Sequence, residues 1–76
     1  MSMNSRDWAY RAHKYAVMGW LLMAQDTRAL ALLDRMLARW PGDAYALASR
    51  AHVRAQRADR AGAIADAQAL VAAHPA

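Results

Sequence analysis

The residues best suited to metal chemistry in this 76-residue chain are its three histidines. His13, His52 and His74 do not pair with one another, or with a carboxylate, at the spacing of ligands on one helix face. A zinc site needs three or four ligands, so these side chains do not form one. The chain also has no cysteine, which excludes disulfides and thiolate-bound metals. We therefore expect no metal site.

Ser49 and His52 lie three residues apart and would supply two members of a catalytic triad. The sequence provides no third member for this pair and shows no oxyanion hole. It also lacks a glycine-rich phosphate loop, and its aspartates are spread over helix caps and helix surfaces. We expect no catalytic residue and no cofactor, which leaves binding as the function to consider.

The net charge of +4 and the aromatic residues near the N-terminus raise the question of nucleic acid. Basic residues are spread along the chain, so we interpret them as solvating helix faces. Trp8, Tyr10, Tyr15 and Trp20 would form a stacking platform for bases, but aromatic residues at helical spacing are more typical of a core. Nucleic-acid binding is therefore the weaker alternative, and we expect no such partner.

Targeting and membrane signals are also missing from the sequence. Residues 1–7 contain no apolar segment after a basic one, as a signal peptide requires. The longest strongly apolar run, residues 16–24, is far shorter than the roughly 20 residues that span a bilayer. We expect a cytoplasmic protein with no membrane partner. The excess of Arg over Lys and the abundance of Ala suggest a GC-rich, bacterial genome.

Apolar periodicity and capping residues predict four helices, over residues 6–24, 27–39, 44–57 and 60–73. Asp26, Asp43 and Asp59 stand where N-caps are needed. Residues 1–5 are expected to be disordered. No segment has the alternation of a strand. The fold class is therefore all-α, and short connections imply antiparallel neighbours.

Each predicted helix has a face expected to pack inward. We expect Leu33→Ala and Leu70→Ala each to destabilise the fold by about 2–4 kcal/mol, and Arg54→Ala to do much less. The inward faces are Trp8, Ala12, Tyr15, Ala16, Gly19 and Leu22 or Met23 in the first helix; Leu30, Leu33, Met36, Leu37 and Trp40 in the second; Leu47, Ala51 and Ala55 or Arg54 in the third; and Ile64, Ala67, Leu70 and Val71 in the fourth.

Pro41 and Pro75 each end a helical segment. Their spacing resembles the period of the tetratricopeptide repeat, a helix–turn–helix unit of about 34 residues. The similarity covers about residues 10–76 and departs from the family where Ala16 and Arg50 replace a usual Leu, and where Leu33 and Ala67 replace a usual aromatic. The first repeat is also looser in its opening helix, with His13 where the family has a large residue and Val17 where it has a small one. The compared positions are His13, Val17, Ala29, Leu30, Met36 and Pro41 in the first repeat, and Leu47, Ala51, Ala63, Ile64, Leu70 and Pro75 in the second.

This resemblance implies two antiparallel hairpins, residues 6–41 and 42–76, stacked as a short right-handed α-solenoid in one compact domain. Solenoids usually end in a helix with a polar outer face, and no such helix is evident here. We therefore expect the chain to be a piece of a longer bacterial repeat protein, with a small protein that uses a partner as its cap as the alternative. Two repeats also leave apolar faces at both ends, which predicts self-association.

In the family, the first helix of each repeat lines a concave groove that binds a peptide or helix. The resemblance therefore implies a non-enzymatic protein-interaction module with a basic rim and an apolar floor. Only Lys14 fits the family's carboxylate clamp, because Met18 and His52 replace Asn. The residues implied for the groove are Arg11, Lys14, Met18, Leu21 and Leu22 in the first repeat, and Tyr45, Ala48, His52, Ala55 and Gln56 in the second.

Two other functions stay open at this point. Residues 19–22 and 29–34 are similar to small chaperones of type III secretion systems, which use such repeats to hold an export substrate. Alternatively, repeats of this kind often precede the catalytic domain of a larger enzyme such as a glycosyltransferase. The sequence alone does not identify the partner.

Overall fold

The computed structural model describes residues 5–75, and this part of the chain is helical without any strand. The four helices are α1 (Ser5–Leu22), α2 (Asp26–Arg39), α3 (Ala44–Gln56) and α4 (Arg60–Ala73). The prediction of four helices is confirmed, with α4 at its predicted bounds and α1 ending two residues early. Ser5, expected to be disordered, begins α1; residues 1–4 lie outside the described part.

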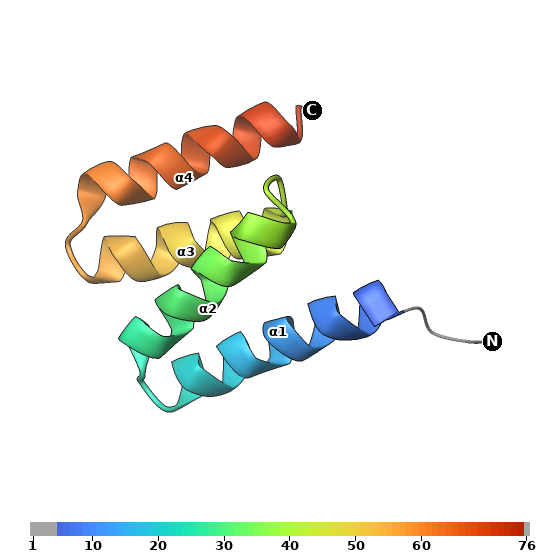
Figure 1. The fold of residues 1–76 in the computed structure, drawn as a ribbon. Helices are drawn as coiled ribbons and strands as arrows, with labels where there is room; N and C mark the ends of the chain where they lie inside the picture. The colour runs from blue at the N-terminus through green and yellow to red at the C-terminus, as the bar shows by residue number, and fades with distance from the viewer. Residues whose placement is uncertain (1–4, 76) are drawn as a thin grey trace.

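The helices are arranged in a row in which each packs against its neighbour in sequence. Backbone contacts join α1 to α2, α2 to α3 and α3 to α4, and no other pair of helices in the described chain approaches as closely. Figure 1 shows α3 and α4 side by side, α2 crossing toward α3, and α1 beyond α2. The outer faces of α1 and α4 therefore lie at opposite ends of the row.

The end of α1 is a Schellman motif, which satisfies carbonyl groups at a helix C-terminus. Ala24 adopts a left-handed conformation with φ of 57°. Its N–H donates to the Leu21 carbonyl over 3.1 Å, and the Gln25 N–H donates to the Trp20 carbonyl over 2.8 Å. This motif closes α1 and turns the chain into α2.

The same motif recurs at the end of α3, at the spacing that separates the two prolines. Ala58 has φ of 63°. Its N–H donates to the Ala55 carbonyl over 3.1 Å, and the Asp59 N–H donates to the Arg54 carbonyl over 2.8 Å. Both ends of α2 are separated from the corresponding ends of α4 by this same spacing. The spacing of the prolines is therefore also the spacing of these helix ends and turns.

Replacing Ala58 with glycine is expected to stabilise the fold by about 0.5–1 kcal/mol. An alanine in the left-handed region costs the folded state roughly 1–2 kcal/mol, and glycine avoids this cost. Glycine also makes the unfolded chain more flexible, which reduces the gain by about 0.4–1 kcal/mol. Urea unfolding should show a higher midpoint for Ala58→Gly. The control, Ala55→Gly inside α3, should lose up to about 1 kcal/mol. A lower midpoint for Ala58→Gly would contradict the left-handed geometry.

Two of the three predicted N-caps are confirmed. The Asp43 carboxylate accepts the Ala46 N–H over 2.9 Å, and the Asp59 carboxylate accepts the Gly62 N–H over 2.9 Å. Each bond satisfies a donor that has no partner within its helix. A Cβ at Gly62 would overlap the Asp59 carboxylate, so a larger residue there would have to displace the capping group.

The third predicted cap is wrong. Gln25 is the N-cap of α2 and makes no hydrogen bond through its side chain, while Asp26 is already the first helical residue. The Schellman motif at the end of α1 explains the shift, because Gln25 is its last residue and α2 begins directly after it. Asp26 still lies in the first turn, where a negative charge interacts favourably with the helix dipole.

The core is small and centred on α2. Leu33 and Met36 of α2 are fully buried and cluster with Val17 of α1 and Ala46 of α3. Other side chains are partly buried against this cluster: Leu32 and Leu37 of α2, Trp40 just after it, Tyr10, Leu21 and Tyr45. The predicted inward face of α2 is therefore confirmed around Leu33.

The predicted inward face of α1 is wrong. Trp8, Tyr15 and Met23 are each about two thirds exposed, and Leu22 is 88% exposed. The helix instead turns Tyr10, Val17 and Leu21 toward α2. Both faces are apolar, but the second also gives the Tyr10 hydroxyl a hydrogen bond and its ring an aromatic neighbour.

The predicted inward face of α4 is also wrong. Ile64 is 51% exposed and Val71 70% exposed, Ala67 is exposed, and Leu70 is only half-buried. The residue that α4 buries is Asp66, at 2% exposure. Arginines of α3 decide this orientation, because they supply the charge that a buried carboxylate requires.

Candidate protein-binding surface

The residues implied for the groove all lie on α1 and α3. Lys14 and Tyr45 meet across the two helices, with the Lys14 Nζ 4.9 Å from the centre of the Tyr45 ring. A cation at this distance from a ring face is attracted by its quadrupole. This contact joins one residue of each implied face, although the backbones of α1 and α3 do not pack directly.

Other groove residues differ in how much surface they offer a partner. Met18 is 44% exposed and Leu22 is 88% exposed, so both present apolar surface. Leu21 and Tyr45 are partly buried against the core, which leaves less of each available. Five other groove residues are exposed to solvent: Arg11, Ala48, His52, Ala55 and Gln56.

A second link joins α1 to the start of α3 beside this surface. The Tyr10 hydroxyl donates to Asp43 Oδ2 over 3.1 Å, and the Tyr10 ring meets Trp40 edge to face at 5.1 Å. Burial, followed by the hydrogen bond to the Asp43 carboxylate, raises the pKa of Tyr10 to about 12. Asp43 therefore caps α3 and also holds α1 in place.

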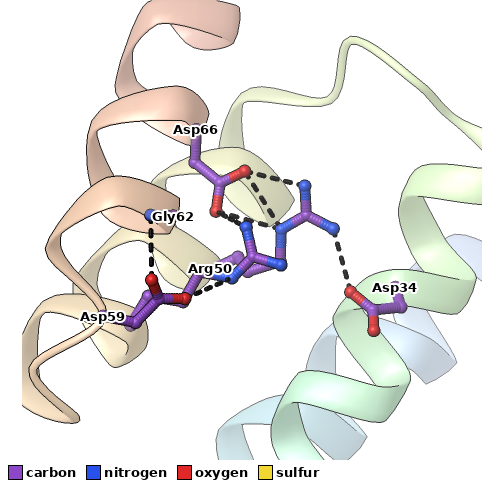
Figure 2. Close-up of polar contacts among 6 residues, drawn as sticks. Asp34, Arg50, Asp59, Gly62 and Asp66 are labelled. Atoms are coloured by element: carbon purple, nitrogen blue, oxygen red, sulfur yellow. Dashed lines mark hydrogen bonds and ion pairs between the residues drawn. The ribbon is translucent and has the colours of Figure 1, made fainter.

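A charged cluster is built around Arg50 on α3, where the family resemblance expects leucine. Its Nε donates to both oxygens of Asp66 over 3.1 and 3.0 Å, and its Nη2 donates to Asp66 Oδ1 over 2.7 Å. Its Nη1 donates to Asp34 of α2 over 2.9 Å. Figure 2 shows Arg50 between the two carboxylates, so one side chain joins α2, α3 and α4.

Arg54 completes this charged cluster. Its Nη1 donates to Asp66 Oδ2 over 3.0 Å, and its Nε lies 3.8 Å from the Asp59 carboxylate. The hydrogen bond with Asp66 is the main reason that the pKa of Arg50 is raised. Sequence reasoning missed the cluster, although two arginines one turn apart opposite a lone aspartate were a usable signal. These contacts join three helices, so the cluster positions α2, α3 and α4 relative to one another.

The histidines lie apart in the structure. His13 Nδ1 donates to the Ala9 carbonyl over 2.7 Å, and His74 Nε2 donates to the Gly42 carbonyl over 2.6 Å. His52 is exposed on α3. Within residues 5–75, no three His or Asp side chains are grouped so as to hold a metal ion.

Large apolar side chains are exposed outside the groove as well. The outer face of α1 exposes Trp8, Tyr15 and Met23, and the outer face of α4 exposes Ile64 and Val71. Exposed apolar surface on this scale marks interaction sites in soluble proteins. None of the helices described is long and apolar enough to cross a bilayer.

Known proteins place no further constraint on this surface. No family model matches the chain, and no curated protein or solved structure is significantly similar to it.

Proposed function

We propose that this chain is a non-enzymatic protein-interaction module that resembles the tetratricopeptide repeat and binds a peptide or helix across α1 and α3. The observation that supports the proposal is the contact between Lys14 and Tyr45, which joins one residue of each implied face. The repeat of the backbone at the proline spacing supports it, because equivalent helices then present equivalent faces.

The chemistry of this surface defines the class of partner. Arg11, Lys14 and His52 supply positive or titratable groups, while Met18 and Leu22 supply apolar area. A short amphipathic segment with acidic and apolar side chains is complementary to both. The net charge of +4 would also speed its association through long-range attraction.

The experiment is selection from a displayed library of random short peptides, followed by titration of the best peptide against the isotope-labelled chain. Amide shifts are expected to move together at Lys14, Met18, Leu22, Tyr45 and His52. Leu22→Asp should weaken binding by roughly tenfold or more, because it places a charge in the apolar part of the contact. Lys14→Ala should mainly lower the association rate and its dependence on salt.

The matched control is Val71→Asp, which also replaces an exposed apolar residue with a carboxylate but lies on α4. It should bind the selected peptide like the unmodified chain. Shifts confined to the outer faces of α2 and α4, or equal losses for Leu22→Asp and Val71→Asp, would contradict the groove. Failure to select any peptide would contradict the function itself.

A further inference from the structure

We infer that the outer face of α4 binds the outer face of α1 from a second copy of this chain, head to tail. The junction between α2 and α3 inside the molecule shows how such a contact is made. There, Arg50 of α3 bonds to Asp34 of α2 over 2.9 Å, and Arg57 bonds to the Thr27 hydroxyl over 3.0 Å. Ala46 completes this side of α3, since it packs into the core that α2 dominates.

The face of α3 that meets α2 has a counterpart on α1, one repeat period earlier in the chain. At helical spacing that α3 face runs through Ala46, Arg50, Val53 and Arg57. Its two apolar members, Ala46 and Val53, are fully buried. The counterparts on α1 are exposed or half-buried, and they are Ala12, Ala16, Gly19 and Met23.

The face of α2 that meets α3 likewise has a counterpart on α4, one repeat period later in the chain. Thr27, Leu30 and Asp34 of α2 line a hollow of about 510 Å³ together with Arg54 and Arg57. The counterparts on α4 are Ala61, Ile64 and Gln68, all exposed. Two of them, Ile64 and Gln68, line an open hollow of about 430 Å³ along α4, with Ala67, Val71 and Ala72.

The two outer faces are complementary in chemistry. The charged pair Arg50 and Asp34 is replaced by Ala16 and Gln68, so no charge of one face meets a charge of the other. The pair Arg57 and Thr27 is replaced by Met23 and Ala61, which are both apolar. A contact with the geometry of the internal junction would therefore bury apolar surface without leaving an ion unpaired.

A second copy is the occupant that the chain itself supplies, because it carries both halves of the contact on a repeated backbone. The space beside Gly19 is open, so a second chain has room to approach the α1 backbone there. A shallow hollow of about 250 Å³ around Ala16, Gly19, Trp20 and Met23 can receive a side chain such as Val71. The two faces differ, so the contact is heterologous and repeats without closing.

Sedimentation equilibrium over a wide concentration series tests this contact. The average mass of the unmodified chain should rise with concentration beyond two chains. Gly19→Glu blocks the α1 face, and Val71→Glu blocks the α4 face; each should remain at the mass of one chain. Ala69→Glu makes the same charge change on an exposed part of α4 away from this face, and should associate normally.

Mixing the two blocked variants identifies which faces meet. Each variant keeps one intact face, so an equal mixture should form pairs of one chain of each kind and grow no further. Circular dichroism should show that both variants remain helical, and Met23→Glu provides a second block of α1 if Gly19→Glu loses helix. Growth that stops at such mixed pairs is expected only for a head-to-tail contact.

Three outcomes would overturn the inference. One is an unmodified chain that stays a monomer at its highest soluble concentration. Another is association of either blocked variant with itself, which would mean that like faces meet. The third is a mixture of the blocked variants that stays monomeric. These residues do not belong to the groove, so peptide binding to Lys14 and Leu22 is tested independently.

Discussion

Leu33→Ala is expected to lower the free energy of unfolding by about 3–4 kcal/mol. Leu33 is fully buried where α1, α2 and α3 meet, in contact with a cluster containing Val17, Met36 and Ala46. Removing a buried leucine side chain loses its transfer free energy and leaves a cavity that neighbours fill only partly. Domains of this kind are stable by about 5–15 kcal/mol, so this loss would be a large share.

Two leucine controls make the Leu33 result specific. Leu70 was expected from the sequence to be its equivalent, but the residue is only half-buried, so Leu70→Ala should lose about 1–2 kcal/mol. Leu22 is 88% exposed, and Leu22→Ala should change stability by less than about 0.5 kcal/mol. Urea titration followed by circular dichroism measures all three. Equal midpoints for Leu33→Ala and Leu22→Ala would show that the core is elsewhere.

Arg50→Met is expected to lower the free energy of unfolding by about 2–3 kcal/mol. Asp66 is 2% exposed, and three of its contacts come from the Arg50 guanidinium. Losing Arg50 leaves a buried carboxylate with Arg54 as its remaining partner, and breaking a buried ion pair usually costs about 3–5 kcal/mol. The contact to Asp34 on α2 is lost as well.

The test of the Arg50 prediction is a double-mutant cycle with Asp66→Leu. The double variant should be less destabilised than the sum of the single variants by at least about 1 kcal/mol, because it leaves no buried carboxylate. Additive losses would mean that the two side chains do not interact. Arg35→Ala, an exposed arginine on α2, is the surface control and should be nearly neutral.

Arg54→Ala was expected from the sequence to do little, and the structure changes that expectation. Its Nη1 donates to the buried Asp66 carboxylate over 3.0 Å, a charge-assisted bond. A loss of about 1 kcal/mol is now expected, smaller than for Arg50 because Arg50 still neutralises Asp66. Helical spacing placed Arg54 near a packing line, but it did not reveal the carboxylate opposite.

Helix positions could be predicted because their signals are local. Pro41, Asp43 and Asp59 act on the backbone within a few residues, and the structure places helix ends at or near them. Gln25 shows the limit, since the left-handed Ala24 moved the cap by one residue. Short-range stereochemistry therefore decided most of the secondary structure.

Helix orientation could not be predicted, because it depends on residues far apart in sequence. Both faces of α1 are apolar, and Tyr10 faces inward because Asp43 and Trp40 are there to receive it. In α4, the many alanines give almost no preference for one face, so the pairing of Asp66 with Arg50 decides which face of the helix turns toward α3. For the groove, the sequence identified Lys14 and Tyr45 but not the contact between them.

The row arrangement of the helices determines how cooperative this fold can be. In the described part of the chain, the α1–α2 hairpin meets the α3–α4 hairpin chiefly through the α2–α3 junction. In such a linear array each helix is stabilised mainly by its nearest neighbours, so each hairpin can open while the other stays folded. Amide hydrogens of α1 and α4 should therefore exchange through local opening rather than global unfolding. Arg50 bonds to both hairpins, so it sets how closely the opening of one hairpin is tied to the opening of the other.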